Sequence, residues 1–349
     1  MKNAAMTLGE LARKLGLSKA TVSYALRNSP MVSAATQAFV QKRAAELGYS
    51  PNPIASAFLQ QIRAQGFDRY QANLAFLIPQ REKPNYLDSV QEGAQERARE
   101  LGYGMDIIPY EKDHGTKRLT KMLLARGIVG LVIGPMPSMM GHLDLDWSRF
   151  ACVCYGYSMD DPAIHRVVHH HYQGIRKAFQ MCREKGFRRV GFALSSESDL
   201  RSNRLWSSGY LGMQHLLPKS EKVGLLLTSH EEWGPEAMKK WILKERPDIV
   251  IIHALGYFPG IFNVLKNLPF KVACAVLDRE PDDPCAGIDQ QFSLSGRMLV
   301  DLLSAQIRHN ERGIPGTPIL SMVDGVWVDH PSAKPVPPGG GKTRSRPRR

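Results

Sequence analysis

Apolar segments of strand length alternate with amphipathic segments of helix length from residue 73 to about residue 331. The strand-like segments form two series, LAFLIP 74–79, YGMDII 103–108, GLVIG 130–134 and ACVCYG 151–156, then RRVGFAL 188–194, KVGLLLT 222–228, DIVIIHA 248–254 and KVACAVLD 271–278. Segments between them, such as residues 89–102, carry apolar side chains at helical spacing. Two such series predict two α/β lobes, each a doubly wound parallel sheet wrapped by helices. We expect a ligand cleft between the lobes, beyond the carboxyl ends of the strands.

The chain is expected to contribute to each lobe twice. The N-terminal lobe is assigned residues 73–160 and 290–320, and the C-terminal lobe residues 161–289 and 321–331. Residues 332–349 are too rich in proline, glycine and basic side chains to fold, and they predict a disordered basic tail.

Residues 1–51 follow a different pattern, which predicts a compact group of three short helices. Gly16 ends the first helix at a point where a positive φ is expected, and Ser18 can cap the second. The second helix, within LSKATVSYALRN at 17–28, has only two well-placed apolar anchors, Val22 and Leu26. Because a helix that merely covers a core shows a wider apolar stripe, the outward side chains of this one are available to a partner.

The net charge of +13 is concentrated at the two ends of the chain. Residues 1–65 hold eight Lys or Arg and two Glu, and residues 334–349 hold six Lys or Arg and no acidic residue. The rest of the chain is close to neutral. This distribution indicates that the ends attract a polyanion while the middle does something else.

Targeting signals and paired cysteines are both missing from the sequence. No run of about 18 apolar residues occurs, and the N-terminus lacks an apolar run followed by a small-residue cleavage site. Five cysteines are an odd number and, apart from Cys152 and Cys154, they are widely scattered. We interpret them as buried reduced thiols and expect the cytoplasm as the location.

Three motifs in the N-terminal region have a characteristic spacing, namely TVSYAL at 21–26, VSAAT at 32–36 and LGYSPN at 47–52. Together they closely resemble the DNA-binding headpiece of the lactose-repressor and galactose-repressor (LacI/GalR) family. The two-lobed body resembles, more loosely, the core of that family, which is similar to periplasmic sugar-binding proteins. The resemblance implies a helix-turn-helix headpiece in residues 1–51, a hinge helix and linker in 52–72, and an effector-binding core beyond them.

The resemblance also implies which headpiece residues contact DNA. Lys19, Ala20 and Tyr24 correspond to the family's base-reading positions, on a helix that enters the major groove. Contacts to phosphates, which fix register without reading sequence, are expected from the hydroxyl groups of Thr7, Thr21, Ser23, Ser33 and Thr36.

The segment after the headpiece begins with Asn52 and Pro53, a cap followed by proline at the first helical position. A helix this short forms only when it is packed against a partner. By resemblance, Ala55 lies at its tip, and Phe58 stands where most members carry the leucine that wedges into the minor groove. Such a wedge needs a twin, so a homodimer on a pseudo-palindromic operator is implied.

The effector pocket departs from the family's pattern at two positions. Trp206 stands where an arginine is expected three residues before a glycine, and Arg204 is displaced by two. Leu255 stands at about the position of an expected aspartate, with His253 nearby. The usual clamp for sugar hydroxyls is therefore not intact.

Other side chains could replace that clamp. Aromatic stacking on a sugar by Trp206 and Tyr210 is one reading, and plain core packing of Trp206 is the other. The expected effector-binding residues are Tyr86, Arg204, Trp206 and His253.

Enzymatic and metal-binding alternatives lack their usual motifs. The chain has no G-x-S-x-G elbow, no phosphate loop and no dinucleotide fingerprint after a strand, so neither an enzyme nor a cofactor is expected. His169–His171 with Cys152 and Cys154 do not have the spacing of a structural zinc site, so no metal is expected.

We therefore expect a homodimeric DNA-binding transcriptional regulator, a repressor, whose operator affinity is modulated by a small polar effector such as a sugar. Two alternatives stay open. One is an architectural DNA-binding protein that responds to no effector, which the altered clamp favours. The other is a small-molecule carrier or enzyme with a vestigial headpiece.

Overall fold

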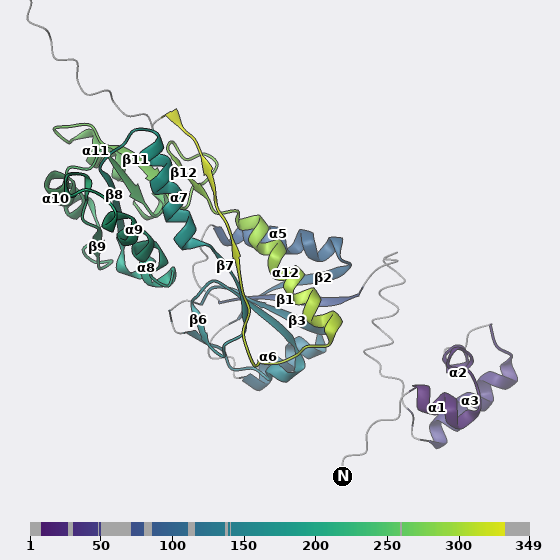
Figure 1. Ribbon diagram of the computed structural model, residues 1–349. Helices are drawn as coiled ribbons and strands as arrows, with labels where there is room; N and C mark the ends of the chain where they lie inside the picture. The colour runs from purple at the N-terminus through teal and green to yellow at the C-terminus, as the bar shows by residue number, and fades with distance from the viewer. Residues whose placement is uncertain are drawn as a thin grey trace, which may run out of the picture. The chain divides into compact units, whose positions relative to one another are not determined.

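The computed structural model describes residues 8–26, 31–47, 49, 71–79, 86–110, 116–136, 139, 141–258 and 260–331. They belong to two compact units, one within residues 1–68 and one within residues 69–349 (Figure 1). The predictions for Thr7, Asn52, Ala55, Phe58 and the tail 332–349 lie outside the described residues.

The described residues of the first unit contain three helices, α1 (Leu8–Leu15), α2 (Lys19–Leu26) and α3 (Ala34–Glu46). Gly16 has φ +65°, which turns the chain between α1 and α2 in a conformation that glycine adopts without strain. All three helices contribute to one small core, formed by Leu11, Ala12, Val22, Ala25, Val40 and Ala44. The predicted three-helix headpiece is thus confirmed within the described residues.

The first lobe of the second unit contains a parallel sheet with the strand order β13-β7-β5-β3-β1-β2. The strands are β1 (Ala72–Pro79), β2 (Tyr103–Tyr110), β3 (Ile128–Ile133), β5 (Ala151–Tyr155), β7 (His165–His169) and β13 (Leu320–Val323). The helices are α5 (Tyr86–Glu100), α6 (Thr116–Ala125) and α12 (Phe292–His309). Helices α5 and α12 contribute to the core on one face of the sheet, and α6 to that on the other (Figure 1).

The second lobe repeats this architecture with the strand order β14-β12-β11-β10-β8-β9, in which only β14 is antiparallel to its neighbour. The strands are β8 (Val190–Ser195), β9 (Leu226–Thr228), β10 (Ile249–Ile252), β11 (Ala273–Val276), β12 (Ala286–Asp289) and β14 (Val326–Val328). The helices are α7 (His171–Glu184), α8 (Ser196–Arg201), α9 (Leu205–His215), α10 (Pro235–Glu245) and α11 (Ile261–Lys266). A small pair, β4 (Gly141–His142) and β6 (Met159–Asp161), and short 3₁₀ turns at Trp147–Arg149, Lys219–Glu221 and Leu255–Tyr257 complete the fold.

The chain passes between the lobes three times, after β7, after β12 and after β13. The expected lobe boundary at 160/161 precedes β7 and the one at 320/321 falls within β13, yet both strands pair within the first sheet. The first and third crossings therefore lie near residues 170 and 324, which corrects the expected limits. The expected second crossing, at 289/290, falls directly after β12.

Two helices of the first lobe pack unusually closely. A Cβ on Gly296 of α12 would lie 2.0 Å from the Val90 carbonyl oxygen of α5. Conversely, a Cβ on Gly93 of α5 would lie 2.1 Å from the Ser293 carbonyl oxygen of α12. The two helices therefore meet backbone to backbone, which only glycine permits at these positions.

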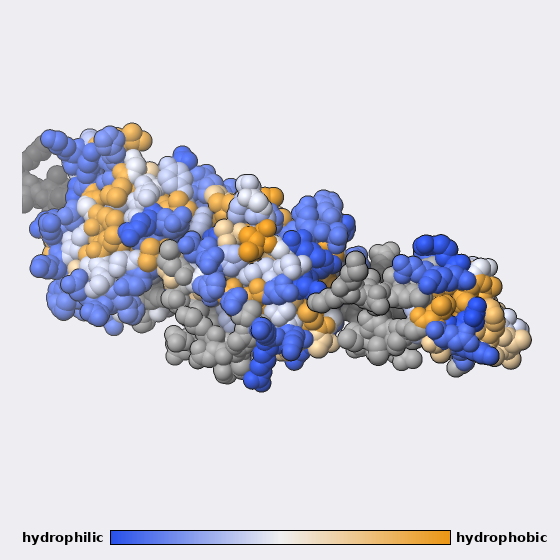
Figure 2. Space-filling view, turned by 90° about the horizontal axis from the view of Figure 1, so that it is seen from below, coloured by the Kyte–Doolittle hydropathy of each residue, from blue (hydrophilic) through white to orange (hydrophobic). Residues whose placement is uncertain are grey.

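The surface and the cysteines of the described residues are typical of a globular protein. Figure 2 shows hydrophilic residues over much of the visible face, with apolar residues in patches between them. All five cysteines are buried and free, which confirms their interpretation as reduced thiols. Among the helices of the described part, none has the length and apolar character needed to cross a bilayer.

Candidate functional site

The surface of α2 is the first candidate site. Val22 and Ala25 are completely buried against the other two helices, whereas Lys19 and Tyr24 are exposed, Tyr24 by 36%. Leu26, expected to be a main anchor, is only partly buried, so Ala25 takes that role together with Val22. The helix is thus fixed from one side and offers a cation and an amphipathic ring to solvent.

Serine hydroxyl groups cap the N-termini of α2 and α3 at this surface. The Ser18 Oγ accepts a hydrogen bond of 3.0 Å from the Thr21 backbone N–H, and the Ser33 Oγ accepts one of 3.2 Å from Thr36. In each pair the two side-chain oxygens also lie 2.9 Å apart. The predicted cap at Ser18 is confirmed, and Thr21, Ser33 and Thr36 belong to caps as well as to the predicted phosphate-contacting set.

The starts of α2 and α3 are favourable places for anions. Neither helix has an acidic side chain in its first turn. The partial positive charge of a helix N-terminus therefore stays uncompensated there. Gln41 of α3 also donates a hydrogen bond of 3.1 Å to the Ala25 carbonyl oxygen, which fixes α3 against the end of α2.

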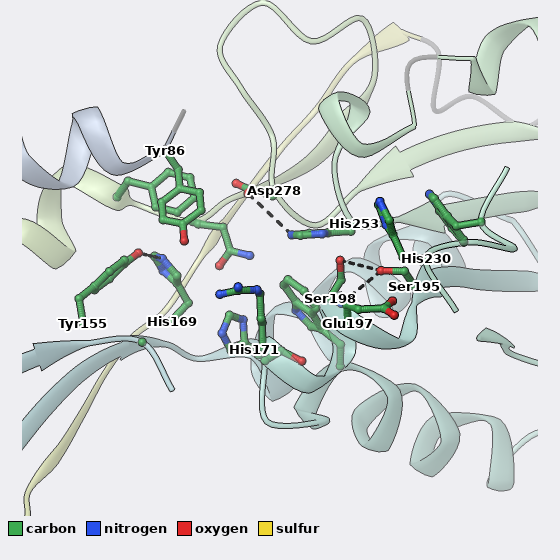
Figure 3. A pocket seen from close by; sticks show the side chains of 17 residues that line it. Tyr86, Tyr155, His169, His171, Ser195, Glu197, Ser198, His230, His253 and Asp278 are labelled. Carbon is green, nitrogen blue, oxygen red and sulfur yellow. Dashed lines mark hydrogen bonds and ion pairs between the residues drawn. The ribbon is translucent and has the colours of Figure 1, made fainter. Parts of the chain in front are cut away.

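A cavity of about 360 Å³ in the second unit is the second candidate site. Its lining includes residues at or just beyond the carboxyl ends of strands from both sheets, as expected for doubly wound folds. Those residues are Tyr155 and His169 from the first lobe and Ser195, His253 and Asp278 from the second (Figure 3). A volume in this range suits a small molecule.

One wall of the cavity is a continuous series of ring contacts. Tyr86 stacks on Phe292 with centroids 5.0 Å apart, and Phe292 meets His169 edge-on at 4.8 Å. His169 then contacts His171 at 5.8 Å, and His171 contacts Trp206 at 4.6 Å. The series joins aromatic side chains of the first lobe to those of the second.

The four buried titratable side chains His169, His171, His253 and Asp278, which line the cavity, are close to electrically neutral at pH 7. Burial lowers the pKa of His169 and of His253 to about 4, and it lowers the pKa of His171 well below its usual value. Burial, together with the nearby acidic residues, raises the pKa of Asp278 to about 8. The imidazoles are therefore uncharged at neutral pH, and Asp278 mostly carries its proton.

Three of the four predicted effector residues, Tyr86, Trp206 and His253, come together in this cavity. Arg204 does not line it, because it precedes α9 in a left-handed conformation with φ +57° and its side chain is exposed. Arg201, at the end of α8, lines the cavity instead.

The suggestion that Tyr210 stacks on a ligand is wrong. Its side chain is completely buried, and its hydroxyl donates to the carbonyl oxygens of Val190 and Val223 at 3.1 and 2.8 Å. Tyr210 therefore belongs to the core of the second lobe.

Sequence reasoning missed Tyr155, His169, His171 and Asp278. Asp278 is the last residue of the predicted strand segment 271–278, so its position beyond a carboxyl strand end was a usable signal. His169 and His171 were considered only as metal ligands, whereas His170 between them faces Asp324 at 2.6 Å. In the described residues, no group of three or more His, Cys, Asp or Glu side chains is arranged to hold a metal ion.

Residues 7–52 match the family model described as bacterial regulatory proteins, lacI family. A curated relative is the HTH-type transcriptional repressor PurR of Pectobacterium atrosepticum, which is 22% identical over 232 residues. That match covers 65% of this chain and 62% of the relative, so it spans less than two thirds of the relative's length.

Solved structures share the fold over nearly the whole chain. The lac repressor dimer bound to operator and the anti-inducer ONPF is similar with a TM-score of 0.55 and 18% identity, over 95% of this chain and 100% of that one. The transcriptional regulator CelR in complex with cellobiose has a TM-score of 0.54 and 17% identity, over 94% and 99%. The two-lobed architecture that follows a helical N-terminal domain is therefore the one expected from the sequence.

Proposed function

Because its first domain is that of the lacI family of bacterial regulatory proteins, we propose that this protein is a sequence-specific transcriptional repressor. It binds a pseudo-palindromic operator as a homodimer, in the cytoplasm, where the DNA is. A small polar effector in the cavity between the lobes modulates that binding, and sugars are the first class to test. The proposal rests on the placement of α2. Val22 and Ala25 anchor this helix in the core of the first unit, while Lys19 and Tyr24 are exposed.

Base reading is assigned to α2 in the major groove. Lysine donates to guanine O6 and N7, the methyl of Ala20 suits a thymine methyl, and Tyr24 offers a hydroxyl and an apolar ring. The phosphate contacts are assigned to Thr7, Thr21, Ser23, Ser33 and Thr36. The acid-free first turns of α2 and α3 support this assignment.

The hinge assignment rests on the family resemblance. Asn52 begins a short helix, Ala55 lies at its tip, and Phe58 enters the minor groove beside its twin from a second subunit. Inserting an apolar wedge costs a few kcal/mol of unstacking, which the contacts of the bent duplex offset.

Effector control is proposed to act through the lobes. A ligand changes operator affinity only if it binds one arrangement of the lobes better than the other. The series of ring contacts along the cavity wall supports such coupling, because residues of both lobes line the same cavity and contact one another.

Binding-site selection with the full-length protein tests the proposal. Lys19→Ala and Tyr24→Ala should each weaken binding to the selected site by about 1–3 kcal/mol and relax base preference at one position. Lys42→Ala, a change of an exposed lysine on α3, is the matched control and should keep the preferred sequence. Equal affinity for the selected inverted repeat and random duplex at moderate salt would refute sequence-specific binding.

An architectural protein without an effector is the second candidate, favoured by Trp206 at the position where an arginine was expected. It predicts that no small molecule in the cavity changes operator affinity. The cavity itself, lined from both lobes, argues for the effector-controlled regulator.

A further inference from the structure

The lining of the cavity contains a carboxyl group, that of Asp278, without a matching cation among the described residues. The Asp278 side chain is 13% exposed, and its Oδ1 is buried with no hydrogen-bond partner. Within 4 Å of its carboxylate, the described residues offer one basic group, His253, whose Nε2 lies 3.9 Å from Oδ2. Because burial keeps that imidazole uncharged at neutral pH, it leaves the charge of an ionised Asp278 unbalanced.

The other charged groups around Asp278 do not supply the missing cation, and the guanidinium of the next residue, Arg279, donates to carbonyl oxygens of its own loop. Glu280, Asp283 and Asp289 are all acidic, and each disfavours ionisation of Asp278. Glu197, His230 and Arg201 line the cavity from the α8 side, where Figure 3 places Glu197 and His230 away from Asp278. Arg201 donates a hydrogen bond of 3.3 Å to the Met136 carbonyl oxygen.

An aromatic ring lies close to this carboxyl, because Trp206 contacts His253 with ring centroids 4.6 Å apart. The Trp206 side chain is 3% exposed, and its indole N–H, which can only donate, has no acceptor in the described residues. Tyr86, Phe292 and Trp233 also line the cavity. Aromatic rings together with a carboxyl that lacks a cationic partner attract organic cations more than neutral molecules of the same shape.

We propose that the effector carries a protonated amine, which pairs with the Asp278 carboxylate, and an oxygen atom, which accepts a hydrogen bond from the Trp206 indole. This inference rests on the proposed function, in which the cavity is the effector site. The amine supplies a positive charge that none of the described residues places within 4 Å of the Asp278 carboxylate. The oxygen atom satisfies a buried donor that otherwise lacks a partner.

The proposal fixes the sign of the pH dependence. Since the pKa of Asp278 is raised to about 8, a cation that pairs with its carboxylate displaces a proton on binding at pH 7. Affinity for an amine should therefore rise about tenfold from pH 6 to pH 7 and level off above pH 8. An uncharged ligand that accepts a hydrogen bond from protonated Asp278 would instead bind more weakly above pH 8.

Calorimetry and thermal unfolding of the full-length protein with matched probes test this. Tyramine is compared with tyrosol, in which a hydroxyl replaces the amine, and glucosamine with N-acetylglucosamine, whose nitrogen is uncharged. Tyramine suits the pH series because an aliphatic amine stays protonated below about pH 10. We expect an amine to bind at least about tenfold tighter than its neutral partner, as loss of one charged hydrogen bond would predict.

Variants assign the preference to the two side chains. Asp278→Asn should abolish the preference for the amine and leave the neutral probe within about twofold, whereas Trp206→Phe should weaken both members of a pair. Asp282→Asn, a change of an exposed acid in the neighbouring loop, is the matched control and should change neither.

The outcomes separate this inference from the proposed function. Equal or tighter binding of the neutral partners, no binding by either amine, or an unchanged preference in Asp278→Asn would overturn the inference, even if operator binding is intact. Failure to bind any selected operator would overturn the proposed function, because amine binding alone does not require DNA.

Discussion

Several side chains that line the cavity have protonation states near neutral pH that differ from those usual for their residue types. Histidine is normally half-charged near pH 6.5 and aspartate fully charged, whereas here the imidazoles of His169 and His253 stay neutral and Asp278 stays protonated. The common cause is burial, which disfavours whichever form is charged. Both deviations are therefore measurable as changes of stability with pH.

We predict that the stability of the protein passes through a maximum near pH 6.5. The histidines bind fewer protons folded than unfolded, so stability rises as the pH increases from about 4 to 6.5. Asp278 binds its proton more tightly when folded, so its contribution is present at low pH and is lost as the pH rises through about 8. Denaturant unfolding should show a decline of roughly 1–2 kcal/mol between pH 6.5 and 8.

Asp278→Asn removes the titrating group and should flatten that decline, while it keeps the rise below pH 6.5. An unchanged decline in this variant would assign the effect to another group. Asp282→Asn, whose side chain is exposed, should retain the wild-type profile.

Sequence reasoning located the cavity better than it located its contacts. Trp206 and His253 were found because they stand at or near positions where the resembled family carries its arginine and aspartate, and Tyr86 was chosen as a residue of the first lobe that could close the cleft. Arg204 failed because two residues of displacement, in a left-handed turn, carry its side chain away from the lining. Asp278 was overlooked because its position beyond a strand end becomes significant only when the neighbouring strands are in place.

At the scale of elements, the close approach of α5 and α12 places the first residue of α12, Phe292, against Tyr86 of α5. Gly93 and Gly296 allow the backbones to approach, since added Cβ atoms would overlap carbonyl oxygens of the facing helix. Two aromatic residues of the cavity wall therefore depend on the packing of two helices that are far apart in sequence.

Gly296→Ala should destabilise the protein by about 2–4 kcal/mol, because the facing atom is backbone and cannot rotate away. Chemical denaturation followed by circular dichroism measures the change. Gly174→Ala in α7 is the control, since its Cβ would meet open space, and it should be neutral or stabilising by up to about 1 kcal/mol. Similar effects of the two substitutions would contradict a tight α5–α12 contact.

The strands that the sequence predicted are those with long apolar runs. All eight segments of the two series contain strands of the structure, because a strand covered on both faces must be apolar throughout. The strands β4, β6, β7, β12, β13 and β14 lie outside those segments and were missed. β13 also has exposed side chains at Leu320 and Met322, so it lacks the signature of a buried strand.

At the scale of the whole molecule, the regions of high net positive charge are separate in sequence from the cavity proposed to bind the effector. The net positive charge is concentrated in residues 1–65 and 334–349, while the cavity lies in the nearly neutral middle of the chain. DNA affinity and effector affinity should therefore respond to different solution variables. Ionic strength should control the first, and pH the second.

Removal of residues 332–349 should weaken binding to random duplex and make it less dependent on salt, because six basic side chains are lost. The preferred operator sequence should stay the same, since α2 is intact. Fluorescence anisotropy between about 50 and 200 mM salt measures both slopes. An identical slope for the full-length and shortened chains would show that the tail does not contact DNA.

The three crossings between the lobes restrict how the core can move. A single connection would let one lobe rotate freely relative to the other. Three connecting segments that run side by side resist twisting and sliding, so they permit mainly bending of one lobe toward the other. Opening and closing then approach one mechanical degree of freedom. A ligand that contacts both lobes therefore selects one angle between them. That angle is then transmitted to whatever is attached to the lobes.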